Sequence, residues 1–129
     1  MVDKQQTIVI VEDEPDTAEM FAEMMRLSGY RVIKSHGGTR AIAQISEAMP
    51  AAVVLDLMMP DLSGLEVLRY MRRDPRLVEV PVVIVSAKSL PSDIKTGMEA
   101  GASMYLTKPV AFQDLKLAVE ASIRKVRAS

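Results

Sequence analysis

The chain contains no cysteine, and aromatic residues make up only 4% of its 129 residues. The lack of cysteine excludes disulfides, thiolate zinc sites and thiol catalysis. Charged residues interrupt every apolar run well short of the roughly 20 residues that a membrane-spanning helix needs. Residues 1–6 also lack the apolar segment of a signal peptide, so we expect the protein in the cytoplasm and not in a membrane.

Neither sign of charge predominates, because 16 basic side chains stand against 17 acidic ones and the formal net charge is −1. We therefore expect no generally basic face and no direct binding of nucleic acid. The length suits one domain, and a content of 49% hydrophobic and 26% charged residues is typical of a globular protein. We expect a single domain over residues 1–129, with its core at about 7–126.

The sequence does contain a regular alternation of two hydrophobic patterns. Short β-branched runs, several of them apolar without alternation, predict strands buried on both faces of a parallel sheet. These runs lie at Thr7–Val11, Arg31–Ile33, Ala51–Leu55, Val82–Val85 and Met104–Leu106. Apolar residues at helical spacing follow each run and predict helices. The helical stripes lie at Ala18–Met25, Ala41–Met49, Leu65–Met71, Ile94–Met98 and Phe112–Val126.

Five repeats of strand then helix predict parallel strands joined by right-handed crossovers, with helices on both faces of the sheet. At this length we expect a doubly wound, flavodoxin-like α/β fold with five strands in the order 2-1-3-4-5. A (β/α)₈ barrel would need about twice the length.

Polar residues follow four of the five predicted strands. The first strand leads into Glu12 and Asp13, the third into Asp56, the fourth into Ser86 and the fifth into Lys108. In open α/β sheets, sites form beyond the carboxyl ends of the strands, at the topological switch point. Because these four strands are neighbours in the expected order, their polar ends should converge on one crevice.

The residues of this crevice predict a site for a metal and a phosphoryl group. Three carboxylates repel one another, and one lysine cannot neutralise them. A hard divalent cation such as Mg²⁺ or Mn²⁺ can, because all the ligands are oxygen atoms. An Asp carboxylate is ionised at neutral pH and can attack phosphorus without a general base. We therefore predict an aspartyl-phosphate site with Asp56 as nucleophile, and with the metal, Lys108 and Ser86 contacting the transferred group.

In these residues the sequence resembles the receiver domain of two-component response regulators, from Ile8 to about Val126. Each matching segment alone is weak, but all of them in order at the family's spacing are specific. The segments are Ile8–Pro15, Leu55–Asp61 with Gly64, Val83–Ala87 and Gly101–Pro109.

The resemblance implies that Asp56 accepts a phosphoryl group from a phosphohistidine on a sensor histidine kinase or phosphotransfer protein. Glu12 and Asp13 would be the acidic pair that holds Mg²⁺, with Asp13 a direct ligand. The metal would also take the backbone carbonyl of Met58. Met58 and Lys88 occupy two positions that vary in the family, and an apolar Met58 predicts slow loss of the phosphate.

The resemblance also implies a conformational switch. Ser86 would move toward the phosphoryl oxygen, Lys108 would pair with that group, and the Lys108–Pro109 bond would be cis. The Tyr105 ring would then turn inward and change the face made by the fourth helix, fifth strand and fifth helix. A downstream protein or fused output domain would bind that face, and a phosphorylation-linked homodimer stays open. Val110 departs from the family, which more often has an aromatic residue there.

Three other functions fit the sequence less well. A phosphatase with an aspartyl nucleophile needs an acid/base carboxylate where this chain has Met58, so we expect self-phosphorylation and dephosphorylation without enzymatic turnover. A flavin binder needs a phosphate loop after the first strand, where Glu12 and Asp13 would repel phosphate. A receiver used only as a scaffold, without phosphorylation, is disfavoured by the complete set of site residues.

Overall fold

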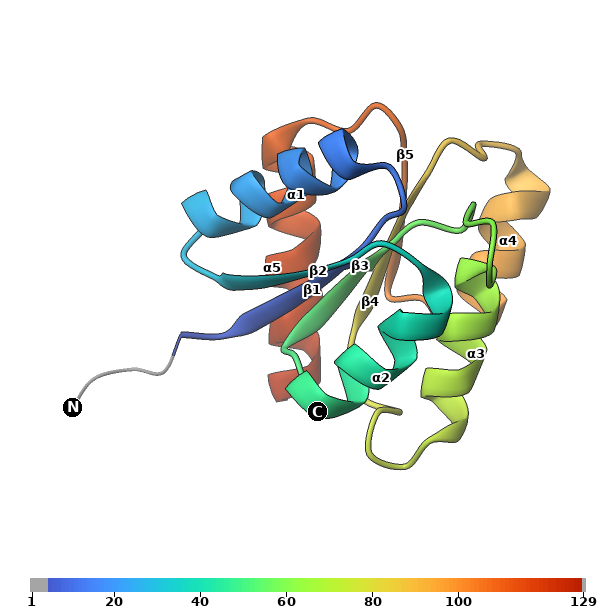
Figure 1. Cartoon of the computed structure of the whole chain (residues 1–129), viewed down its shortest axis with the longest axis horizontal. Helices are drawn as coiled ribbons and strands as arrows, with labels where there is room; N and C mark the ends of the chain where they lie inside the picture. Colours follow the sequence, from blue (N-terminus) through green and yellow to red (C-terminus); the bar gives the residue numbers. More distant parts are fainter. Residues whose placement is uncertain (1–4, 129) are drawn as a thin grey trace.

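The computed structural model describes residues 5–128, in which strands and helices alternate from end to end (Figure 1). The strands are β1 (Thr7–Val11), β2 (Arg31–Ser35), β3 (Ala52–Leu55), β4 (Val82–Ser86) and β5 (Met104–Thr107). The helices are α1 (Pro15–Leu27), α2 (Gly38–Ala48), α3 (Gly64–Arg73), α4 (Pro91–Glu99) and α5 (Phe112–Ala128).

The five strands form one parallel sheet in the order β2-β1-β3-β4-β5, which confirms the predicted doubly wound topology. The central strands are apolar on both faces because both faces are covered by helices. Residues 8–11 of β1, all of β3 and all of β4 are buried.

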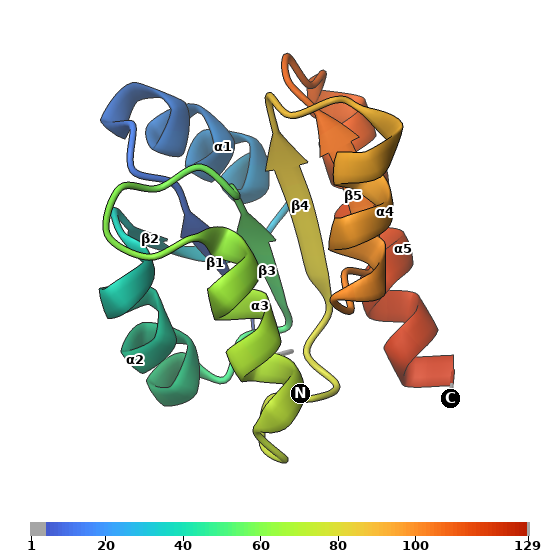
Figure 2. The same ribbon diagram turned by 90° about the vertical axis from the view of Figure 1, so that its right-hand side faces the viewer.

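The side chains of alternate strand residues pack into two separate hydrophobic cores, one on each face of the sheet. On one face, Ile8 and Ile10 pack with Phe21 of α1 and Leu115 of α5. On the other face, Val9 and Val11 pack in a core with residues of α2 and α3. Figure 2 shows α4 on this same side, near β5. The strand period of two residues therefore divides each apolar run between the two helical layers.

Three observed strands extend slightly beyond the predicted ones, whereas β3 begins one residue later than predicted, at Ala52. β2 continues to Ser35, β4 includes Ser86 and β5 includes Thr107, so Ser86 ends its strand and does not follow it. The added residues are polar or charged, which is why an apolar pattern does not reveal them. No helix within residues 5–128 combines the length and the apolar character needed to cross a bilayer.

The register brings the carboxyl ends of four strands to one edge. Val11 of β1 pairs with Leu55 of β3, and Leu55 pairs with Ile84 of β4. Ser86 at the end of β4 pairs with Thr107 at the end of β5. The residues that follow β1 and β3, the last residue of β4 and the residue that follows β5 therefore meet at this edge.

Candidate functional site: an acidic cluster with a lysine

Three carboxylates meet where β1 and β3 end. Glu12 is 2% exposed, and its N–H donates to the carbonyl of Ser35 at 2.9 Å, which continues the β1–β2 ladder. Asp56 is 6% exposed, and its N–H donates to the carbonyl of Val11 at 3.0 Å. Glu12, Asp13 and Asp56 each offer a carboxylate oxygen, and these atoms lie within 4.8 Å of one another.

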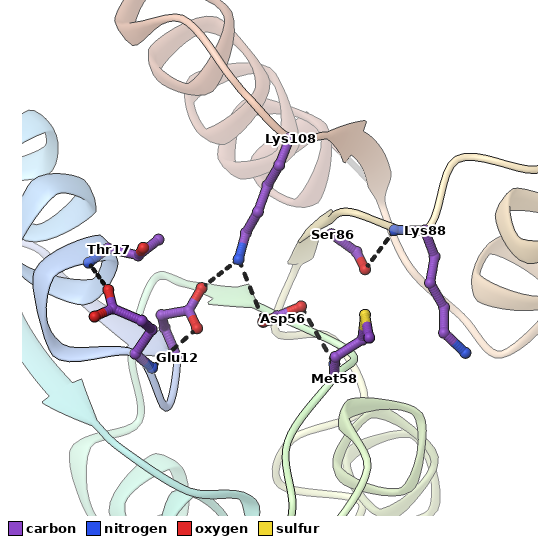
Figure 3. A network of polar contacts seen from close by, with 8 residues as sticks. Glu12, Thr17, Asp56, Met58, Ser86, Lys88 and Lys108 are labelled. Atoms are coloured by element: carbon purple, nitrogen blue, oxygen red, sulfur yellow. Dashed lines mark hydrogen bonds and ion pairs between the residues drawn. The ribbon is translucent and has the colours of Figure 1, made fainter.

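Lys108 is the cation of this cluster (Figure 3). Its Nζ lies 2.6 Å from Glu12 Oε1 and 3.3 Å from Asp56 Oδ2. The Lys108 N–H donates to the carbonyl of Ser86 at 2.9 Å, which holds the segment after β5 against β4. The bond from Lys108 to Pro109 is cis, as the resemblance implied.

Burial and charge oppose each other at this contact. Burial raises the pKa of Glu12, and the charge of Asp56 adds to that effect, while the hydrogen bond from Lys108 lowers it. Burial also disfavours the Lys108 ammonium, but the hydrogen bond to Glu12 and the charge of Asp56 outweigh it and raise the pKa of Lys108. The cluster therefore favours the charged form of Lys108 and disfavours the charged form of Glu12.

The loop after β3 is built closely around Asp56. The Met58 N–H donates to Asp56 Oδ1 at 3.2 Å, which orients the carboxylate. Gly64, the first residue of α3, donates its N–H to the carbonyl of Leu57 at 3.1 Å. A Cβ on Gly64 would lie 2.2 Å from the carbonyl oxygen of Asp56, so only glycine allows the helix to begin this close.

Ser86 and Tyr105 are connected through the backbone of Lys88. The Lys88 N–H donates to Ser86 Oγ at 3.2 Å, and the Tyr105 hydroxyl donates to the Lys88 carbonyl at 2.8 Å. Ser86 is fully buried and Tyr105 is half-buried. The two predicted switch residues are therefore linked by two successive hydrogen bonds.

The third acidic residue of the first loop has another task. Glu14 is the N-cap of α1, and its carboxylate accepts the Thr17 N–H at 2.6 Å. That hydrogen bond lowers the pKa of Glu14. Glu14 thus stabilises the helix start, while Glu12 and Asp13 remain with Asp56.

Asp61 ends one of the segments that match the receiver family, but neither the hydrophobic pattern nor the resemblance gives it a role. Its Oδ1 accepts the Gly38 N–H at 3.1 Å and its Oδ2 accepts the Thr39 N–H at 3.0 Å. The N-cap of α2 is Gly37, which has no side chain to do this. Asp61 therefore caps α2 from the loop that carries Asp56 and Met58. No local signal identifies it, because the two segments are 22 or 23 residues apart.

The sequence matches the response regulator receiver domain over residues 8–120. It is 34% identical over 119 residues to the phosphate regulon transcriptional regulatory protein PhoB of Pseudomonas aeruginosa, covering 92% of this chain and 52% of PhoB. It is 35% identical over 121 residues to the DNA-binding response regulator MtrA of Mycolicibacterium smegmatis, covering 94% and 52%. The chain spans about half the length of the curated relatives it matches.

Solved structures agree with this similarity. The receiver domain of a sensor histidine kinase from Pseudomonas aeruginosa, described with a magnesium ion in its active-site cleft, superposes with a TM-score of 0.86. The two sequences are 28% identical, and the match covers 94% of this chain and 99% of the other.

Proposed function

The chain belongs to the family of response regulator receiver domains, and we propose that Asp56 is its phosphoacceptor. The observation that supports this most directly is the placement of Asp56 at the end of β3, between an acidic pair and Lys108. In the transfer, an Asp56 carboxylate oxygen forms a bond to phosphorus while the bond from phosphorus to the donor's histidine nitrogen breaks. The nitrogen keeps the electron pair, and the imidazole remains on the donor.

The donor set of the cluster fits Mg²⁺ or Mn²⁺. Glu12, Asp13 and Asp56 supply only oxygen atoms, and the backbone carbonyl of Met58 would add a fourth. When held there, the ion would supply positive charge to the phosphoryl oxygens and so lower the barrier to transfer. Asp13 is the most accessible of the three acids, which suits a direct ligand, whereas Glu12 is held by Lys108.

Lys108 and Ser86 supply the remaining contacts to the phosphoryl group. Lys108 already lies against Asp56, so its ammonium needs little movement to pair with a phosphoryl oxygen. Ser86 Oγ accepts the Lys88 N–H, and a shift of the hydroxyl toward the phosphate would release that donor. Because Tyr105 holds the carbonyl of Lys88, the release would reach α4, β5 and α5.

The proposed partners follow from this chemistry. A sensor histidine kinase or phosphotransfer protein would donate the phosphoryl group, and a downstream protein or attached output domain would respond to the altered face of α4, β5 and α5. Phosphorylation-linked dimerisation through the same face remains an open alternative. We expect residues 1–129 to form a single receiver domain, with its core at about 7–126, and to work in the cytoplasm.

The domain would act as a switch and not as a turnover enzyme. It would catalyse its own phosphorylation and then lose the phosphate slowly, because Met58 offers no polar group to align an attacking water. The lifetime of the phosphate would then set the duration of the signal.

Intact mass spectrometry tests this function. We expect the chain, incubated with Mg²⁺ and acetyl phosphate, to gain the mass of one phosphoryl group, and Asp56→Asn to gain none. Asp114→Asn, which alters an exposed acid in the first turn of α5, is the matched control and should be phosphorylated like the original chain. Equal phosphorylation of the original chain and Asp56→Asn, or of neither, would reject the assignment.

A further inference from the structure

The side chain of Met58 is exposed at the rim of the acidic cluster. It is 53% exposed, more than any of the other exposed methionines of the described residues, which are Met20, Met49, Met98 and Met104. Its backbone N–H donates to Asp56 Oδ1, so the Met58 side chain starts beside the proposed phosphoacceptor. Figure 3 shows the sulfur pointing toward Ser86 and the Lys88 backbone, on the side of Asp56 away from Glu12.

An exposed thioether is open to oxidation, and here oxidation would change the chemistry of the site. Methionine sulfoxide replaces a flexible apolar side chain by a polar one with a strong acceptor oxygen. Its shape is close to that of glutamine, with the S=O in the place of the side-chain carbonyl. The modified residue could thus accept a hydrogen bond from a water beside Asp56, which the thioether does only weakly.

We propose that Met58 is a site of peroxide oxidation that shortens the lifetime of the Asp56 phosphate; this inference rests on the proposed phosphorylation of Asp56. In the reaction the sulfur attacks one peroxide oxygen, an S–O bond forms and the O–O bond breaks. Sulfur loses two electrons to the peroxide, and the second oxygen leaves as water. Methionine sulfoxide reductases reverse the change, so the effect is that of a reversible switch.

Burial or position separates Met58 from Met25, Met71, Met49 and Met104. Met25 and Met71 are fully buried in the two cores, so peroxide reaches them only on unfolding. Met49 follows α2 and Met104 begins β5, so both lie at the opposite edge of the sheet from Asp56. Oxidation at those residues does not place an acceptor beside the phosphoryl group.

The experiment compares phosphate loss before and after oxidation. The chain is treated with hydrogen peroxide, the peroxide is removed, and the protein is phosphorylated with acetyl phosphate and Mg²⁺. Intact mass spectrometry follows the decay of the phosphorylated form, and peptide mass spectrometry gives the oxidised fraction of each methionine. Met58→Leu cannot be oxidised at this position, and Met98→Leu retains Met58 while removing a comparably exposed methionine of α4.

We expect Met58 to oxidise before Met25 and Met71, and the decay to become about fivefold faster, the factor that one hydrogen bond to the water supplies. Met98→Leu should respond to peroxide in the same way, and Met58→Leu should show the same decay with and without treatment. Met58→Gln, which imitates the sulfoxide, should decay faster than Met58→Leu without any peroxide.

The rate of phosphate loss tests the role of Met58, whereas the uptake of phosphate by the untreated chain tests the proposed function of Asp56. Unchanged decay at full Met58 oxidation would overturn it, as would an equal response of Met58→Leu to peroxide. Oxidation of Met58 no faster than that of the buried methionines would also overturn it. If the untreated chain takes up no phosphate at all, the proposed function is rejected and the inference falls with it.

Discussion

The Tyr105 hydroxyl donates a hydrogen bond to the backbone carbonyl of Lys88 at 2.8 Å. This contact holds an aromatic side chain of β5 against the segment that follows β4. The ring also lies over α4, because a Cβ on Gly97 would stand 2.9 Å from Tyr105 Cδ2. The orientation of Tyr105 thus depends on one hydrogen bond and on the absence of a side chain at one helical position.

We predict that Gly97→Ala displaces the Tyr105 ring. The added methyl group would stand 2.9 Å from both Ile84 Cδ1 and Tyr105 Cδ2, so we expect both side chains to shift and the hydrogen bond from Tyr105 to Lys88 to weaken. Alanine itself favours the helix by about 1 kcal/mol. NMR of fluorinated tyrosine would report a new environment for Tyr105. Tyr105→Phe, which lacks the hydroxyl, is the control that assigns the signal. An unaltered Tyr105 resonance in Gly97→Ala would contradict the packing described here.

We predict that Met58→Asn loses phosphate faster than the original chain. The amide can accept a hydrogen bond from an attacking water, and one such bond corresponds to about a five- to tenfold change in rate. The decay of phosphorylated protein after removal of the phosphodonor measures the effect, with Met58→Leu as the apolar control. If the asparagine and leucine variants decay alike, Met58 does not control the lifetime.

Asp61 should contribute to stability in a manner that depends on pH. The hydrogen bonds from Thr39 and Gly38 lower the pKa of Asp61 to about 2. A carboxyl whose folded pKa is depressed stabilises the fold above its unfolded pKa of about 4, and this stabilisation disappears as the pH falls to about 2. Asp61→Ala should therefore melt a few degrees lower at neutral pH.

Thermal melts at several pH values test this expectation. The difference between the original chain and Asp61→Ala should shrink steadily as the pH falls through the folded pKa. Asp16→Ala, which alters an exposed acid in the first turn of α1, controls for the loss of one charge. A difference that stays constant down to about pH 2 would show that the Asp61 charge is not responsible.

Arg72 should be important for the stability of the fold on the side of α3. Its Nε donates to the carbonyl of Gly101 at 2.9 Å, and its Nη1 donates to those of Val80 at 2.8 Å and Val78 at 3.1 Å. Burial lowers the pKa of the Arg72 guanidinium. Its hydrogen bonds connect the turn before β5 to the segment before β4. Arg72→Leu would leave these carbonyls without their donor.

We expect Arg72→Leu to lower the free energy of unfolding by about 2–4 kcal/mol, since several bonds from a charged donor are lost. Urea denaturation measures the change. Arg69→Leu, on an exposed position of the same helix, should cost much less, because its partner Glu66 is also exposed. Equal effects of the two substitutions would refute the role assigned to Arg72.

Magnesium should stabilise the folded chain through the acidic cluster. An ion at about 100 times its dissociation constant adds about 2.7 kcal/mol to the free energy of unfolding. Removal of the metal with EDTA should reverse the gain, and Asp13→Asn should abolish most of it. Asp16→Asn carries the same charge change outside the cluster and should keep the gain. A similar response of both variants would argue against a site at Asp13.

Much of the site could be predicted from the sequence because its residues stand at the ends of apolar runs. An uninterrupted run such as that of β3 is buried on both faces, and parallel topology then brings Asp56 to the same edge as Glu12 and Lys108. This inference needs only the period of the pattern and the order of the elements. The family resemblance added the roles of these residues, which periodicity does not contain.

The contacts between distant elements were decided only by the tertiary structure. Lys108 lies closer to Glu12 than to Asp56, and Asp61 caps a helix that begins more than 20 residues earlier in the chain. Both contacts depend on where the crossover connections place their loops. The need for glycine at position 97 is likewise visible only in the tertiary structure, because it comes from the Tyr105 ring that packs over this residue. Local patterns determine which elements form, whereas the fit of side chains across the sheet edge depends on the packing of the whole.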